Sequence, residues 1–203
     1  MTSQVLLASL YLPPVSYFHT ILNSPNPIFI EQYEHFQKQS YRSRTRIATA
    51  NGIQDLIVPI QHGRKERVPF KDIRISYEFD WQRLHWMGLQ SAYRSSAYFE
   101  YYEDDFAPFY KQKETFLLDL NMKQLQLILK SLKIKNEVLL TDSYQTVFEN
   151  IVDYREIIHP KKPAVMPETK PYYQVFSDKN GFFPELSIVD LLFNQGPQSK
   201  NYL

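Results

Sequence analysis

The chain has 203 residues, the size of one ordinary domain, and its content of 43% hydrophobic and 22% charged residues is that of a globular protein rather than a disordered or fibrous one. Its formal net charge of +1 excludes overall electrostatic attraction as a basis for binding nucleic acid or an anionic membrane. The chain has no cysteine, which excludes disulfides, thiolate nucleophiles and cysteine-ligated metals.

The first 30 residues predict a strand, a short helix and a second strand. An apolar run at Val5–Ser9 ends before Pro13-Pro14, and apolar residues at helical spacing follow from Val15 to Leu22. After the turn-forming residues 23–27, Ile28–Ile30 has the character of a buried strand. This order is typical of a β-α-β unit with two parallel strands.

The next segment, Tyr41–Ile60, alternates as a strand does and contains Asn51-Gly52, the residue pair that favours a tight hairpin turn. A short strand is expected at Ile73–Ile75. Helices are expected at Trp81–Ser91, Ser96–Tyr102, Glu114–Leu132 and Leu186–Phe193, a strand at Glu137–Leu140, and a proline-rich surface loop at His159–Pro171. These elements predict a single α/β or α+β domain over residues 1–203, with a mixed sheet and flanking helices.

Three arginines in the hairpin form a possible ligand-binding face. If Tyr41–Ile47 is extended, Arg42, Arg44 and Arg46 project to the same side. Arginine matches the paired oxygens of carboxylates and phosphates, so this face is a candidate for anion binding. A solvated strand face paired with acidic side chains is the alternative.

The helix over Leu117–Lys133 has a polar stripe and an opposite apolar face. Asn121 and Gln124 fall within the apolar face, so both amides are predicted to be buried. A buried amide needs a hydrogen-bond partner, which is either a structural one inside the core or a ligand in a pocket. His19, in the apolar helix after the first strand, is either an ordinary core or surface histidine or a general base near the strand ends.

Several functional classes have no motif in the chain. The glycine-rich dinucleotide and phosphate-loop motifs are missing, as are the HExxH and GxSxG motifs, so no metal site is expected and the cofactor is left open. Tyrosines beside the basic residues carry no signature of an RNA-binding module, so nucleic acid is not expected as a partner. No apolar stretch is long enough for a membrane span.

Taken together, segments spread over the chain resemble the WbqC-like protein family. The matching residues include Tyr11-Leu12-Pro13, Tyr17-Phe18-His19, Phe36-Gln37-Lys38 with Tyr41, Arg44, Arg46 and Ile47, Leu56–Pro59, His85-Trp86, Leu120-Asn121 and the block Phe183–Asn194 with Gly196-Pro197. The chain departs from the family pattern at Ser9-Leu10, where a Gln-Pro pair is common, and in lacking a glycine-rich segment before the C-terminal region.

The resemblance implies a bacterial cytoplasmic protein of surface-polysaccharide (lipopolysaccharide) biosynthesis. Its expected activity is transfer of an acyl or aminoacyl group onto an anionic sugar precursor, a small-molecule partner. His19 would be the base and Asn121 an orienting or oxyanion group, and the precursor would be bound by Lys38, Tyr41, Arg42, Arg44 and Arg46. A non-catalytic module that binds the same precursor and an assembly protein are the alternatives, and the oligomeric state is left open.

Overall fold

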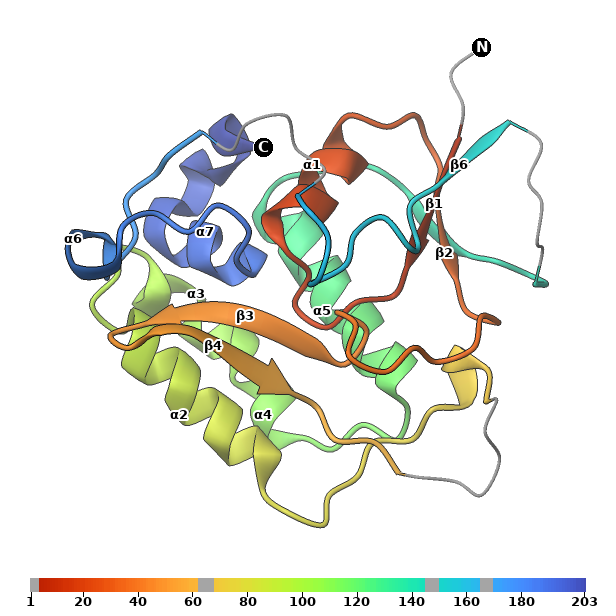
Figure 1. Ribbon diagram of the computed structural model, residues 1–203, viewed down its shortest axis with the longest axis horizontal. Coiled ribbons are helices and arrows are strands. Elements are labelled where there is room, and N and C mark those ends of the chain that lie inside the picture. Colours follow the sequence, from red (N-terminus) through yellow and green to blue (C-terminus); the bar gives the residue numbers. More distant parts are fainter. Residues whose placement is uncertain (1–3, 62–67, 145–149, 165–169) are drawn as a thin grey trace.

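The computed structural model describes residues 4–61, 68–144, 150–164 and 170–203 (Figure 1). The strands are β1 (Gln4–Ala8), β2 (Ile28–Glu31), β3 (Arg44–Thr49), β4 (Gly52–Ile57), β5 (Val138–Leu140) and β6 (Ile151–Asp153). The α-helices are α1 (Val15–Leu22), α2 (Trp81–Tyr93), α3 (Phe99–Phe106), α4 (Pro108–Lys111), α5 (Leu117–Ser131), α6 (Ser177–Asn180) and α7 (Ile188–Gln195), with two 3-10 turns, η1 (Phe70–Asp72) and η2 (Gly196–Tyr202).

Four strands form a parallel sheet in the order β5-β2-β1-β6. The predicted β-α-β unit is confirmed, because β1, α1 and β2 follow one another and Val5 pairs with Ile28 in parallel register. The antiparallel pairing belongs to a separate hairpin of β3 and β4. The α/β class is therefore confirmed, with parallel and antiparallel pairing divided between two sheets.

The hairpin turns where the sequence predicts it. Gly52 has a φ of +100°, a conformation that side-chain-bearing residues rarely adopt, so glycine is required at the first residue of β4. Residue pairs then run from Thr49 opposite Gly52 to Arg44 opposite Ile57. Leu56 turns to the side covered by α2, where its methyl group lies against Gly88.

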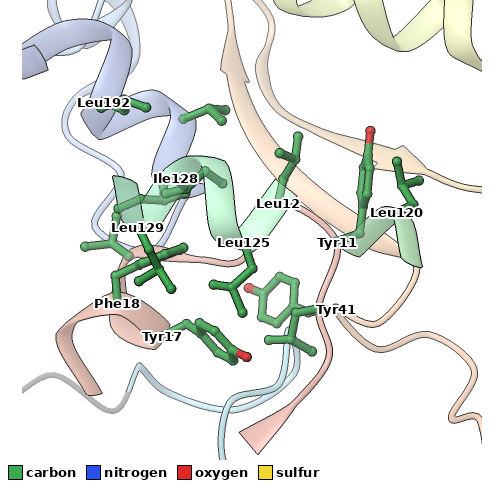
Figure 2. Close-up of a cluster of buried hydrophobic side chains, with 14 of the residues drawn as sticks. Tyr11, Leu12, Tyr17, Phe18, Tyr41, Leu120, Leu125, Ile128, Leu129 and Leu192 are labelled. Carbon is green, nitrogen blue, oxygen red and sulfur yellow. The ribbon is translucent and has the colours of Figure 1, made fainter. Parts of the chain in front are cut away.

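The core lies between the parallel sheet and the helices. Figure 1 shows α1, α5 and α7 on the same side of this sheet. Figure 2 shows how Leu125 and Ile128 of α5 meet Tyr17 and Phe18 of α1, with Leu192 of α7 above them. The expected burial of Asn121 and Gln124 and the expected exposure of the polar stripe on α5 are both confirmed.

Some local expectations are wrong. Residues 73–75 make only isolated bridges, between Ile60 and Ile75 and between Arg74 and Phe116, because no longer partner strand runs beside them. The helix expected from Ser96 begins at Phe99, since the Ser96 hydroxyl and amide both bond back to the Tyr93 carbonyl in a turn. Strand β6 was not expected, and residues 165–169 of the proline-rich loop lie outside the described residues.

The end of α7 is fixed by its glycine. Gly196 has a φ of +50°, and a Cβ there would lie 2.5 Å from the ring of Tyr98. The end of this helix at Gly196 is thus explained both by the backbone conformation and by close packing. Within the described residues, every helix is too short or too polar to cross a membrane.

Candidate functional site

The order of the parallel strands points to one edge of the sheet. The chain places β2 and β5 on one side of β1 and then returns to place β6 on the other side, so the winding direction changes between β1 and β6. In open α/β sheets, ligands bind outside the carboxyl ends of the strands at such a point. Charged side chains gather there in what we call the carboxyl-edge cluster: Glu31, Glu34, Arg42, Asp153 and Arg155.

Two guanidinium groups organise this cluster. Arg42 donates through Nε and Nη2 to the two carboxylate oxygens of Glu34, both at 2.7 Å, and its side chain is only 1% exposed. Arg155 donates through Nε to Oδ1 of Asp153 at 3.0 Å and through Nη2 to Oδ2 at 2.6 Å, and its Nη1 lies 3.7 Å from Glu31. The buried arginines are therefore held in ion pairs with the chain's own carboxylates.

The cluster sets the protonation of its carboxyl groups. Burial raises the pKa of Glu34, although Arg42 opposes this through its hydrogen bonds and charge. Burial also acts to raise the pKa of Asp153, but there the hydrogen bonds and charge of Arg155 prevail and hold it below the ordinary value. Because its guanidinium group is hydrogen-bonded to Glu34, Arg42 stabilises the structure and is not available to bind a ligand.

Arg42 is thus a correction to the expected three-arginine face. Strand β3 begins at Arg44, so the alternation does not reach Arg42, and its side chain turns inward toward Glu34. Arg44 and Arg46 do share a face with Asp55, which lies opposite Arg46 on β4. Their guanidinium nitrogens approach the Asp55 carboxylate at 3.2 and 3.4 Å.

A second group of residues, the hairpin cluster, forms around these two arginines: Tyr41, Arg44, Arg46, Asp55 and Glu185. Burial raises the pKa of Tyr41 to about 12, against the positive charge of Arg46, so its phenol is a neutral hydrogen-bond donor at pH 7. The Nε of Arg44 is buried and has no hydrogen-bond partner among the described residues. Three of the five expected ligand-binding residues therefore meet here.

Glu185 is the member that the sequence did not predict as a site residue. It accepts a hydrogen bond from the Ser16 hydroxyl at the start of α1, and burial raises its pKa. Two residues later the Ser187 amide donates to the Arg46 carbonyl at 2.8 Å, which fixes the C-terminal segment beside β3. The sequence feature that could have identified Glu185 as a site residue is the Phe183–Asn194 block, whose only acidic residues are Glu185 and Asp190.

The two expected catalytic residues lie in different surroundings. The side chain of Asn121 is 1% exposed, and its amide donates to the Arg42 carbonyl at 3.0 Å. This hydrogen bond fixes the backbone segment that connects the two clusters. His19 is partly buried near the end of α1, and its nearest described partner is the Asn23 amide, 3.4 Å from Nδ1. Lys38 is exposed in the loop before β3. No described contact joins His19 to Asn121 or to the arginines.

A buried aromatic group lies beneath the hairpin. The Tyr11 hydroxyl is 2.9 Å from His85 Nδ1 and 3.2 Å from the Tyr110 hydroxyl, and the His85 ring contacts Trp81 edge-on. Burial lowers the pKa of His85 to about 4, so the imidazole is neutral at pH 7. The geometry and the neutral state give His85 a packing role in the core. In the described part of the chain, no three histidine or acidic side chains are placed to hold a metal ion.

Comparison with known proteins gives two findings. The model of the WbqC-like protein family matches residues 9–159, which include β2 to β6 and all five residues of the carboxyl-edge cluster. A curated relative from Mycobacterium tuberculosis (strain ATCC 25618 / H37Rv), named "Uncharacterized protein Rv1507c", is 26% identical over 228 aligned positions, covering 100% of this chain and 98% of the relative. No solved structure gives a significant match. Because the family model covers most of the chain, this protein belongs to the WbqC-like protein family.

Proposed function

We propose that this protein is a transferase that adds an acyl or aminoacyl group to an anionic sugar precursor in bacterial surface-polysaccharide biosynthesis, within the cytoplasm. Family membership supports the setting. The hairpin cluster supports the class of substrate, because arginine forks bind phosphates and carboxylates through paired N–H groups.

One observation carries the proposal: Arg44 and Arg46 form ion pairs with the same carboxylate, Asp55, within 3.4 Å. One carboxylate cannot neutralise both charges, and burial raises the pKa of Glu185, the other carboxyl group that interacts with Arg46. The buried Nε of Arg44 has no acceptor among the described residues, and leaving such a donor unpaired costs about 1–3 kcal/mol. A phosphate oxygen would supply that acceptor, and the Tyr41 phenol, which interacts with Arg46 in the same cluster, is a further donor.

The roles expected for the other residues are revised accordingly. Arg42 and Asn121 hold the backbone at the start of the hairpin from within the core, since the Asn121 amide bonds to the Arg42 carbonyl. His19 as general base and Lys38 as a contact to the precursor stay predictions, and both side chains reach the surface. The proposed binding residues are therefore Tyr41, Arg44 and Arg46.

Binding is tested by thermal denaturation with a uridine diphosphate sugar as the probe. A ligand that binds only the folded state raises the melting temperature by mass action. Arg44→Ala should abolish this rise, whereas Arg83→Ala, an exposed arginine on α2, should retain it. Asp55→Asn should enlarge the rise, because it removes the carboxylate that competes with phosphate. An equal rise in wild type and all three variants would show that the hairpin cluster does not bind the probe.

A non-catalytic binding module is the second candidate. The observation that favours it is the burial of Asn121, whose amide nitrogen is already bonded to backbone and has no route to a substrate. Mass spectrometry of the precursor after incubation with acyl donors separates the two functions. Transfer that is lost in His19→Ala while the thermal shift persists supports the transferase. A thermal shift with no transfer by the wild-type protein supports the module.

A further inference from the structure

The face of the parallel sheet that looks away from α1 and α5 has a cavity that the proposed function does not use. Its volume is about 220 Å³. Leu6 of β1, Phe29 of β2 and Ile151 of β6 supply apolar side chains to it, and Thr141, Asp142 and Ser143, which follow β5, supply polar ones. The cavity is thus apolar over the strands and polar toward their carboxyl ends.

Strand register shows which buried groups lie behind this cavity. Leu6 pairs with Phe29 on one side and with Asp153 on the other, so these three side chains share a face of the sheet. Side chains two residues apart on a strand point the same way, which places Glu31 on the same face as Phe29. The core side chains Val5 and Ile28 have the opposite parity and face the helices.

Glu31 is connected to the cavity through Thr141. Its side chain is 0% exposed, and its Oε1 accepts hydrogen bonds from the Thr141 hydroxyl at 2.9 Å and the Tyr33 amide at 2.8 Å. Its Oε2 has no hydrogen-bond partner among the described residues, and the Arg155 guanidinium is 3.7 Å away in a loose ion pair. Thr141 lines the polar end of the cavity. The carboxyl group of Glu31 lies behind Thr141, and one of its two oxygens accepts no hydrogen bond from the described residues.

Among the residues that the structure describes, acidic groups outnumber basic ones at this end. Asp142 stands on the lining, with Glu31 and Asp153 behind it, whereas Arg155 is the guanidinium that approaches both Glu31 and Asp153. A negative field of this kind attracts cations and repels anions. The apolar side of the cavity favours a ligand with a hydrocarbon body.

From the cavity, its apolar strands and its acidic end, we infer that this face binds a small organic cation: an ammonium group on a short apolar body. The ammonium lies against Asp142 and the hydroxyls of Thr141 and Ser143, and the body lies on Leu6 and Phe29. This site lies on the parallel sheet and not on the hairpin, so it does not depend on the proposed function. Its ligand is a cation, whereas the proposed sugar precursor is an anion.

Three probes of the same shape test the inference with the full chain: benzylamine, benzyl alcohol and benzoate. In amide NMR titrations of the isotope-labelled protein, benzylamine should bind in the millimolar range, as expected for so small a ligand, and shift the amides of Leu6, Phe29 and Thr141. Benzyl alcohol should bind several-fold more weakly, and benzoate should leave these amides unshifted. Equal binding of all three probes, or no shift with benzylamine, would overturn the inference.

A variant of the lining gives an independent test. Asp142 is exposed, so Asp142→Asn should fold normally, which a thermal melt verifies. It should weaken benzylamine binding several-fold and leave benzyl alcohol binding unchanged. Asp119→Asn, at an exposed aspartate on α5, is the matched control and should bind benzylamine as the wild type does. If Asp142→Asn and Asp119→Asn bind benzylamine equally, the acidic end does not recognise the ammonium group.

Discussion

Replacing Arg42 by methionine should destabilise the protein far more than the same change at Arg44, two residues later. Arg42 is 1% exposed and makes a two-bond ion pair with Glu34, whose side chain is 7% exposed. Arg42→Met removes the charge and leaves the buried carboxylate unpaired, which costs about 3–5 kcal/mol. Arg44 pairs with Asp55 at partly exposed positions, 21% and 34%, so its loss should cost about 0–1 kcal/mol.

These energies translate into separable melting temperatures. For a chain of this length each kcal/mol shifts the midpoint by roughly 2–4 °C, so Arg42→Met should lower it by about 6–20 °C and Arg44→Met by about 4 °C or less. Circular dichroism melts at pH 7 measure both. The double variant Arg42→Met/Glu34→Leu should recover most of the loss, because it removes the stranded charge as well.

The defect should also depend on pH. Without Arg42, burial and the charge of Glu156 raise the pKa of Glu34 against the charge of Arg155 only, so its folded-state pKa lies further above the unfolded value. A raised pKa gives stability that is present below the unfolded pKa and lost as the pH rises through the folded pKa. The difference in the free energy of unfolding between wild type and Arg42→Met should therefore grow from pH 4 toward pH 8. The pKa of glutamate in the unfolded chain is about 4.3. Equal losses for Arg42→Met and Arg44→Met would refute this account of the carboxyl-edge cluster.

Three further outcomes are expected. Truncation before Leu186 should give insoluble or molten protein by near-UV circular dichroism, because the apolar side chains of α7 are buried and each large one contributes about 1.5–3 kcal/mol; a cooperative melt would contradict this. Asn121→Ala should lower stability in urea melts by about 1–3 kcal/mol, whereas His19→Ala should leave it nearly unchanged; the reverse order would make His19 the structural residue. Burial raises the pKa of Asp190 to about 6, so the stability of the wild type relative to Asp190→Asn should fall as the pH rises from about 4 to 6, and a flat difference would contradict the raised pKa.

Local elements whose signals lie within a few residues could be predicted from the amino-acid pattern alone. The β-α-β unit follows from apolar runs separated by turn residues, and the hairpin follows from Asn51-Gly52. Helical periodicity was enough to place Asn121 inside the protein, because the position of a side chain around a helix depends only on its spacing from its neighbours. The side chain's partner, the Arg42 carbonyl, could not be read from that periodicity.

The way in which distant segments combine into sites depends on long-range contacts that local patterns do not contain. The alternation that joins Arg44 and Arg46 stops before Arg42, because strand pairing begins at Arg44, and a strand boundary depends on the partner strand rather than on the residue itself. Strand β6 is three residues long, too short to show a period, and exists because β1 offers it an open edge. Its pairing brings Asp153 beside β1 and Arg155 within reach of Glu31, a juxtaposition of segments far apart in the chain that no local pattern contains.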